Sequence, residues 1–180
     1  ETSASATALL DADAGSVLVT GADAAARAAL RSVADDAQED ERARLAWVAR
    51  GVPEPRGLVT IVSGGTSDGP VVREAQVRAE LLGTEVVVHR DAGVAGLHRL
   101  EPAVPGPPRA GCGGVVAGGD AALASVVCGG VAAPGVAAPT STGRGAALGA
   151  GGARAAAVTS CAGGGARVAD QLAERAGRGL

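Results

Sequence analysis

Residues 58–70 read Leu58-Val-Thr-Ile-Val-Ser-Gly-Gly-Thr-Ser-Asp-Gly-Pro70, which is an apolar run followed by a glycine-rich turn and a proline. A continuous apolar run of this length is typical of a strand buried on both faces of a parallel sheet. Pro is favoured in the first turn of a helix, and apolar residues then recur at helical spacing from Val71 to Leu82. The stretch therefore predicts a strand, a glycine turn and a helix.

The same alternation continues along the chain. It predicts further strands at residues 85–89, 113–117 and 135–138, and helices at residues 96–100, 121–128 and 146–158. After residue 165 the sequence predicts a terminal helix and no further strand. Strands that alternate with helices favour an α/β fold with a doubly wound, mostly parallel sheet, a three-layer sandwich of the flavodoxin type. Such sheets bind ligands outside the carboxyl ends of their strands.

The part of the chain before residue 51 has a different pattern. It predicts a helix, a strand at residues 16–20, a helix at residues 22–35 and a short strand, with the acidic stretches Asp35-Asp36 and Glu39-Asp40-Glu41 marking an exposed connection. Gly51-Val-Pro-Glu-Pro-Arg-Gly57 is typical of a linker. We therefore expect a small N-terminal α/β segment at residues 1–56 and the main domain at residues 57–180.

The composition limits the partners of the protein. The chain is 47% hydrophobic but has one Trp and no Phe, Tyr or Met, so its core is built from small side chains and a homo-oligomer would help to stabilise it. The net charge is −3 and the Arg residues are scattered, which argues against binding to nucleic acid.

The sequence has neither a membrane-spanning apolar run of about 18 residues nor a signal-peptide pattern. We expect no contact with a membrane and a cytoplasmic location. Cys112, Cys128 and Cys161 form no C-x-x-C pair, so neither a disulfide framework nor a zinc site is indicated.

Candidate site residues follow the predicted strands. The turn from Ser63 to Asp68 joins a buried strand to a helix, and its amides and hydroxyls suit a phosphate. Asp68 is also a plausible helix N-cap. The binding candidates in this turn are Ser63, Gly64, Gly65, Thr66 and Ser67.

Other polar residues follow the later strands. His98 and Arg99 come after the second strand, although a lone His beside an Arg is more often a packing residue than a catalyst. Gly118-Gly119-Asp120 follows the third strand, where Asp120 suits Mg²⁺, water or a helix cap about equally well. Thr140 and Ser141 follow the fourth strand, where hydroxyl groups suit sugar, phosphate or the turn backbone.

Together these motifs resemble the LarB family, the carboxylase/hydrolases of nickel-pincer nucleotide synthesis, whose catalytic half is similar to PurE. The resemblance rests on the turn at residues 63–70 and on four further segments, in the order and at about the spacing of the family. These segments are Gly93-Val-Ala-Gly-Leu-His-Arg-Leu100, Val116-Ala-Gly-Gly-Asp-Ala-Ala-Leu-Ala-Ser-Val-Val127, Ala138-Pro-Thr-Ser-Thr-Gly143 and Ser160-Cys161-Ala162. The resemblance covers roughly Leu58 to Ala169 and is weaker in residues 16–51, a partial LarB-like N-terminal region.

The resemblance implies a PurE-like fold for residues 57–180 and a reaction on nicotinic acid adenine dinucleotide. The pyridinium ring would be carboxylated with CO₂ or bicarbonate, and the phosphoanhydride hydrolysed, giving pyridinium-3,5-biscarboxylic acid mononucleotide and AMP. Cys161 matches the nucleophilic cysteine of the family, which would add to the ring. The family also forms oligomers, with an octamer as one arrangement.

The remaining roles are carried over residue by residue. Asp120 stands where the family has Glu, thought to serve Mg²⁺ and water at the phosphoanhydride, and the shorter side chain would reach the metal through water. The turn residues match the ribose-phosphate turn shared with PurE, and His98 matches a His-Arg element that faces the substrate. The predicted catalytic residues are Cys161, Asp120, His98 and Asp68.

Two other functions stay open at this point. One is a PurE-like aminoimidazole ribonucleotide carboxylase or mutase, in which His98 and Asp68 would handle protons and carbon dioxide. The other is a divergent, non-catalytic nucleotide-binding protein. Retention of Cys161 favours the LarB-like reading, because PurE chemistry needs no thiol.

Overall fold

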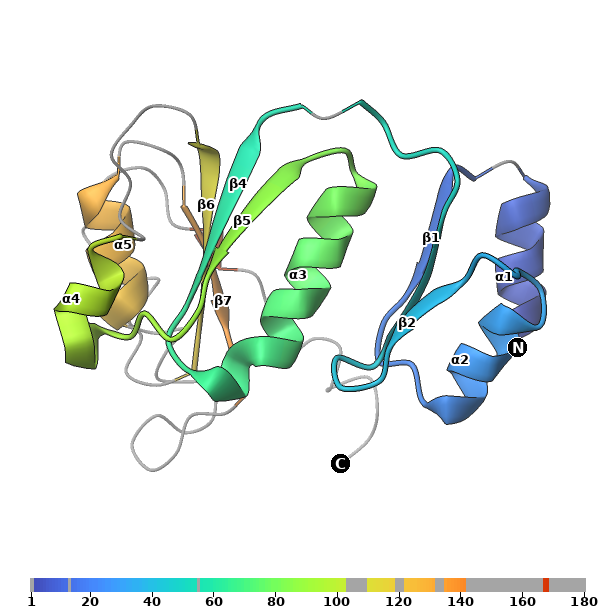
Figure 1. The fold of residues 1–180 in the computed structure, drawn as a ribbon, viewed down its shortest axis with the longest axis horizontal. Helices are drawn as coiled ribbons and strands as arrows, with labels where there is room; N and C mark the ends of the chain where they lie inside the picture. Colours follow the sequence, from blue (N-terminus) through green and yellow to red (C-terminus); the bar gives the residue numbers. More distant parts are fainter. Residues whose placement is uncertain are drawn as a thin grey trace. The chain divides into compact units, whose positions relative to one another are not determined.

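The computed structural model describes residues 2–12, 14–54, 56–102, 110–118, 122–131, 135–141 and 167–168 (Figure 1). These residues form two compact units. Unit 1 holds the described residues up to Arg56 together with Arg73–Glu85, and unit 2 holds those of Gly57–Val72 and those from Val86 onward. The sequence predicts a single domain boundary after residue 56, whereas in the structure residues 73–85 also belong to unit 1.

Unit 1 contains an antiparallel sheet of three strands in the order β1-β3-β2. The strands are β1 (Ser16–Val19), β2 (Gln38–Asp40) and β3 (Leu45–Ala49). The predictions of β1 and β3 are confirmed, but β2 lies in the stretch that was expected to be an exposed connection. Strand β2 is a short edge strand whose residues Gln38 and Glu39 are exposed. Because it consists of polar residues, the sequence has no apolar pattern that would indicate a strand there.

Helices cover both faces of this sheet. They are α1 (Thr2–Asp11), α2 (Ala24–Arg31) and the unit 1 part of α3 (Gly69–Leu81). Because side chains alternate along a strand, Ala46 and Val48 of β3 pack in one cluster with α1 and α2. Leu45 and Trp47 point the other way and pack with Val77 and Leu81 of α3. The central strand is therefore buried on both faces.

Helix α2 is shorter than the predicted helix at residues 22–35. It begins after Asp23, whose carboxylate accepts a hydrogen bond from the Ala26 N–H at 2.8 Å. Ser32 follows the last helical residue and its hydroxyl donates to the Ala29 carbonyl at 2.8 Å. The caps, which helical composition alone does not locate, set these bounds.

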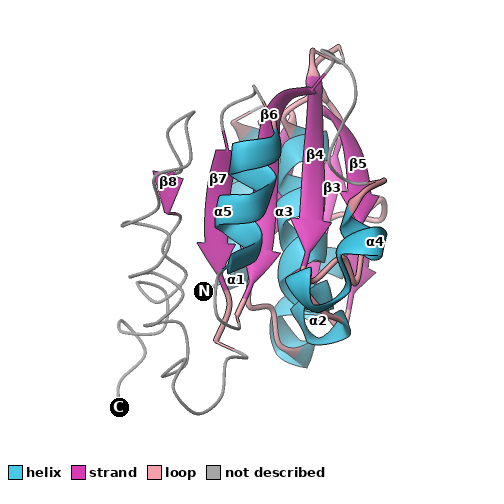
Figure 2. Ribbon diagram, turned by 90° about the vertical axis from the view of Figure 1, so that its left-hand side faces the viewer, coloured by secondary structure: helices cyan, strands magenta, loops and turns pink. Residues whose placement is uncertain are grey.

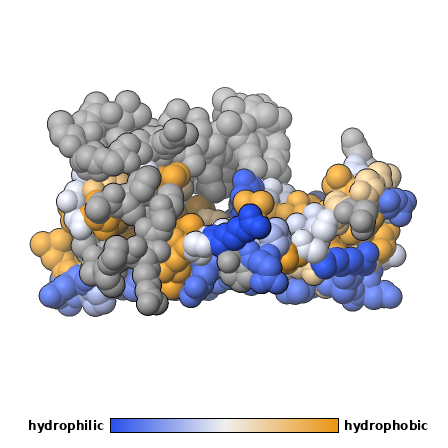
Figure 3. All heavy atoms as spheres, turned by 90° about the horizontal axis from the view of Figure 1, so that it is seen from above, coloured by the Kyte–Doolittle hydropathy of each residue, from blue (hydrophilic) through white to orange (hydrophobic). Residues whose placement is uncertain are grey.

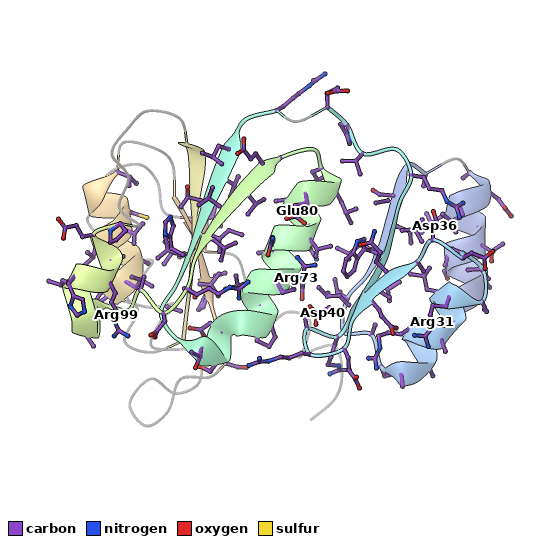
Figure 4. The ribbon with its side chains drawn as sticks, viewed as in Figure 1. Arg31, Asp36, Asp40, Arg73, Glu80 and Arg99 are labelled. Atoms are coloured by element: carbon purple, nitrogen blue, oxygen red, sulfur yellow. The ribbon has the colours of Figure 1, made fainter. Side chains whose placement is uncertain are left out.

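Arg73 links α3 to the sheet of unit 1 through contacts with Trp47 and Asp40. Its guanidinium lies 5.4 Å from the centre of the Trp47 ring, and its Nε is 3.5 Å from the Asp40 carboxylate. In Figure 4, Arg73 and Asp40 lie close together between α3 and β2. Trp47 is only 7% exposed, so the single aromatic residue of the chain is a core residue of unit 1.

Unit 2 is an α/β structure built on a sheet with the order β5-β4-β6-β7-β8. The strands are β4 (Leu58–Ser63), β5 (Glu85–His89), β6 (Ala110–Ala117), β7 (Gly135–Pro139) and β8 (Arg167–Val168). The pairs β4–β6, β6–β7 and β7–β8 are parallel. This confirms the predicted α/β class and its parallel sheet, and it is compatible with a doubly wound fold.

Strand β8 corrects the expectation that no strand follows Cys161. It pairs with β7 through Val136↔Arg167 and Ala137↔Val168. A strand of two residues that contains an Arg has no apolar run, and for this reason the sequence pattern does not indicate it. The helix predicted at residues 146–158 lies outside the described residues, and so does the terminal helix apart from the two residues that form β8.

The helices of unit 2 include the predicted ones that follow β4, β5 and β6, together with two short 3₁₀ helices that the sequence did not predict. They are the short 3₁₀ helix η1 (Thr66–Asp68), the start of α3, the 3₁₀ helix η2 (Val94–Gly96), α4 (Leu97–Leu100) and α5 (Ala122–Gly130). Figure 2 shows α5 lying across β6 and β7. Residues Val62, Val115 and Ala137, neighbours in register, pack with Leu123 and Val127 of α5. The core of unit 2 consists of small aliphatic side chains, as the composition predicts.

The surface mixes polar and apolar residues. Figure 3 shows hydrophilic and hydrophobic residues interspersed over one face. The large hydrophobic side chains that stay exposed among the described residues are Leu9, Val52, Leu82, Val87, Leu97 and Val126. In the described part of the chain, no helix has both the length and the apolar character to cross a membrane.

Candidate functional site

The carboxyl ends of three parallel strands meet at one edge of the unit 2 sheet. In register, Ser63 of β4 lies opposite Val116 of β6, and Ala117 of β6 lies opposite Pro139 of β7. The residues that come next, such as Gly64, therefore leave the sheet at the same edge. This is the edge at which parallel α/β sheets bind their ligands, and the polar candidates of unit 2 follow these strands.

The turn after β4 is closed by its own carboxylate. The Gly65 N–H donates to Oδ2 of Asp68 at 3.0 Å, and the Asp68 N–H donates to the Gly65 carbonyl at 3.2 Å. The Gly64 N–H donates to the Val116 carbonyl at 3.1 Å, which ties the turn to β6. Asp68 is 3% exposed, whereas Thr66 and Ser67 between these anchors are exposed.

Thr140 joins the end of β7 to this turn. Its hydroxyl donates to Oδ1 of Asp68 at 2.7 Å, across 72 residues of sequence. Its backbone N–H donates to the Ala117 carbonyl at 3.1 Å, so Thr140 is also fixed to the end of β6. Thr140 is 1% exposed. The buried pair of Asp68 and Thr140 thus links the ends of β4 and β7.

The loop after β5 packs closely against the turn. The Ala92 N–H donates to the Ser63 carbonyl at 2.9 Å. A Cβ atom at Gly93 would lie 2.7 Å from the Gly64 carbonyl oxygen, closer than any side chain tolerates, so this position requires Gly. Sequence reasoning missed this contact. The signal was the Asp-Ala-Gly turn at residues 91–93, directly after a predicted strand.

His98 and Arg99 lie on α4, and both are exposed. The Arg99 side chain is labelled in Figure 4, and its Nη1 donates to Oδ2 of Asp91 at 2.6 Å. A Cβ atom at Gly96 would lie 2.7 Å from Nε of Arg99, so the guanidinium lies close against this glycine. Asp91 has the left-handed φ of 55°, which Asp tolerates better than most residues. An exposed ion pair of this kind contributes about 0–1 kcal/mol, so an anionic ligand could replace Asp91 as the partner of Arg99 at low cost.

The structure unites part of the predicted site. The predicted residues that join the strand ends through hydrogen bonds or close backbone contacts are Ser63, Gly64, Gly65, Asp68 and Thr140. Gly118 is buried directly after β6, and Ser141 is exposed directly after Thr140. The hydrogen bond of the Arg99 guanidinium goes to Asp91, in the loop before its own helix, rather than to the turn after β4.

The predicted nucleophile and the predicted metal-binding carboxylate are not among the described residues. Cys161, Asp120 and Gly119 fall outside the described residues, so their roles stay predictions. Within the described ranges, no group of three His, Cys, Asp or Glu side chains is placed to hold a metal ion. A Mg²⁺ ion bound through substrate phosphates needs only one or two protein carboxylates, which Asp120 could supply in part.

Comparison with known proteins adds one relative. No protein-family model matches this chain. An uncharacterized protein of Methanocaldococcus jannaschii is 43% identical over 91 residues, which cover 49% of this chain and 36% of that protein. The chain thus matches about a third of the length of this relative, whose name assigns it no activity.

Proposed function

We propose that this chain is a LarB-like carboxylase/hydrolase, with a PurE-like fold in unit 2, and that it acts on nicotinic acid adenine dinucleotide. The observation that carries the proposal is the buried hydrogen bond between Asp68 and Thr140, which brings the turn at residues 63–68 and residues 138–141 together at one sheet edge. Motifs that merely occur in the right order would have no reason to meet. Here they meet where α/β sheets bind nucleotides.

The turn would hold a phosphate of the substrate. Thr66 and Ser67 are exposed and lie between two anchors, the Gly65 amide and the Asp68 carboxylate. Both offer a hydroxyl and a backbone N–H, and such groups at the start of a helix suit an anion. Arg99 would add a positive charge by leaving Asp91, because their exposed ion pair is weak.

Cys161 would carry the covalent chemistry. Its thiolate adds to the ring carbon para to the pyridinium nitrogen and forms a carbon–sulfur bond and a neutral dihydropyridine. The enamine electron pair of this ring attacks CO₂ from the free meta carbon, which gives a new carbon–carbon bond and an iminium ion. A base removes the proton from that carbon, the thiolate leaves, and the aromatic pyridinium returns with a second carboxylate.

Hydrolysis of the phosphoanhydride would then separate the mononucleotide from AMP by addition of water. We assign Mg²⁺ to the substrate phosphates, where Asp120 would hold it through a water molecule and the ion would supply charge neutralisation. Asp68 is engaged with Gly65 and Thr140. We therefore do not place the metal on Asp68.

A turnover assay tests this proposal. The purified protein is incubated with nicotinic acid adenine dinucleotide, Mg²⁺ and labelled bicarbonate, and AMP and labelled pyridine nucleotide are followed by mass spectrometry. We expect both products from the wild-type protein and none of the labelled product from Cys161→Ala. Cys128→Ala is the matched control, because Cys128 is a buried residue of α5 in unit 2 and should not affect turnover.

Two outcomes would contradict the proposal. Equal carboxylation by Cys161→Ala and wild type would remove the thiol from the mechanism. Binding of the dinucleotide without turnover would favour a changed substrate, and aminoimidazole ribonucleotide would be the next compound to test.

A further inference from the structure

The Asp68 carboxylate receives hydrogen bonds at both oxygens. Oδ2 accepts from the Gly65 N–H at 3.0 Å, and Oδ1 accepts from the Thr140 hydroxyl at 2.7 Å. The Asp68 and Thr140 side chains are 3% and 1% exposed, respectively. A buried carboxylate is costly unless such donors satisfy it, so these two bonds help to fix where the carboxylate lies.

Gly65 and Thr140, which both donate to the Asp68 carboxylate, are held in place by different parts of the chain. Thr140 follows β7 directly, and its N–H is bonded to the Ala117 carbonyl of the neighbouring strand. The sheet therefore fixes the position of its hydroxyl. Gly65 belongs to the turn itself, and its amide follows the carboxylate. The sheet thus fixes Thr140, the Thr140 hydroxyl orients the Asp68 carboxylate, and this carboxylate orients the Gly65 amide of the turn.

We infer that Thr140 is a positioning residue for substrate binding, which acts through Asp68 on the turn that carries Thr66 and Ser67. This inference rests on the proposed function, because it assigns those two residues to the substrate phosphate. Thr140 itself is buried and does not contact the ligand. Loss of its hydroxyl weakens binding and raises KM, and it leaves kcat nearly unchanged because the inference gives Thr140 a role in phosphate binding and none in the covalent steps on the ring.

Three variants separate the hydroxyl from the shape of the side chain. Thr140→Val removes the hydroxyl and keeps the branched shape, Thr140→Ser keeps the hydroxyl, and Thr140→Ala is a second deletion if the Val variant does not fold. Amide hydrogen exchange of Gly65 is measured by NMR without ligand, and the Kd and KM for nicotinic acid adenine dinucleotide are measured separately.

We expect the Gly65 amide of Thr140→Val to exchange about tenfold faster than in the wild type. The Kd for the dinucleotide should rise by a similar factor, and the Ser variant should stay within about twofold of the wild type. The amides of Val62 and Val115 in the core should keep their exchange rates, which distinguishes a moved turn from general loss of stability.

The inference is overturned if Gly65 exchange is the same in Thr140→Val and wild type, or if exchange rises equally in the core strands. A wild-type protein that does not bind the dinucleotide, with Gly65 exchange still dependent on Thr140, would refute the proposed function alone. The positioning of the turn by Thr140 would stand in that case.

Discussion

Units 1 and 2 stabilise their sheets by different means. Unit 1 buries its central strand between helices on both faces and adds Trp47 and the Arg73–Asp40 ion pair. Unit 2 has a core of small aliphatic residues, and hydrogen bonds join the loops at the carboxyl ends of its strands. The difference indicates that changes in unit 1 affect stability most, whereas changes at the sheet edge of unit 2 affect binding most.

The largest effect should come from Trp47→Ala in unit 1. Trp47 is 7% exposed and packs with Leu45, Val77 and Leu81, so its removal leaves a cavity. The free energy of unfolding should fall by about 3–5 kcal/mol. Urea denaturation followed by circular dichroism measures this loss. Leu82→Ala is the control, since Leu82 is 71% exposed and should change stability by about 0.5 kcal/mol or less. Similar losses in the two variants would contradict the account.

Gly93→Ala tests whether a change at the sheet edge of unit 2 weakens binding. The new methyl group would lie 2.7 Å from the Gly64 carbonyl oxygen, so the loop after β5 or the turn after β4 must move. We expect a loss of about 1–3 kcal/mol in stability and weaker binding of nicotinic acid adenine dinucleotide, measured by denaturation and calorimetric titration.

The matched control for Gly93→Ala is Gly129→Ala on α5. Among the described residues, no heavy atom outside the neighbouring residues and backbone of its own helix lies within 4 Å of the added Cβ at Gly129. This variant should be neutral or more stable by up to about 1 kcal/mol and should bind the dinucleotide like the wild type. Unchanged binding by Gly93→Ala would refute the close packing of loop and turn.

A smaller effect is expected from Asp91→Ala. This change removes the bond to Arg99 and puts a residue with less tolerance for left-handed backbone at a φ of 55°. The cost in unfolding free energy should be about 1 kcal/mol, with a smaller cost for Asp91→Asn. If Arg99 binds the substrate, Asp91→Ala should bind the dinucleotide as well as or better than the wild type. Thermal denaturation and titration of both variants give these values, and a larger loss in the Asn variant would contradict the backbone argument.

The smallest effect concerns Asp36 and Arg50 on the surface of unit 1. The hydrogen-bonded Arg50 guanidinium lowers the pKa of Asp36 below its ordinary value of 3.8. A lowered folded-state pKa adds stability at neutral pH, and this contribution is lost as the pH falls through the folded-state value. Asp36→Asn should therefore be slightly less stable than wild type at pH 7, with no difference well below pH 3.8.

Urea midpoints of wild type and Asp36→Asn at several pH values measure this contribution. The difference should also shrink in high salt, because both side chains are exposed. A difference that grows as the pH falls would have the wrong sign for this ion pair.

The sequence predicted the elements that have strong apolar patterns, among them β4, β5, β7 and α5. It missed β2 and β8, because a short edge strand of polar residues and a strand of two residues have no such pattern. It selected Asp68 and Thr140 separately as site residues. It could not predict their hydrogen bond, because contacts across 72 residues depend on the strand order, which the sequence pattern leaves undetermined.

We propose that the substrate phosphate binds at the carboxyl edge of the unit 2 sheet. The most direct measurement is an NMR titration of the labelled protein with nicotinic acid adenine dinucleotide, which follows the backbone amide shifts. We predict that the largest changes occur at Gly65, Thr66, Ser67, Gly118 and Thr140. Changes confined to unit 1, or the absence of any change at millimolar dinucleotide, would contradict the claim.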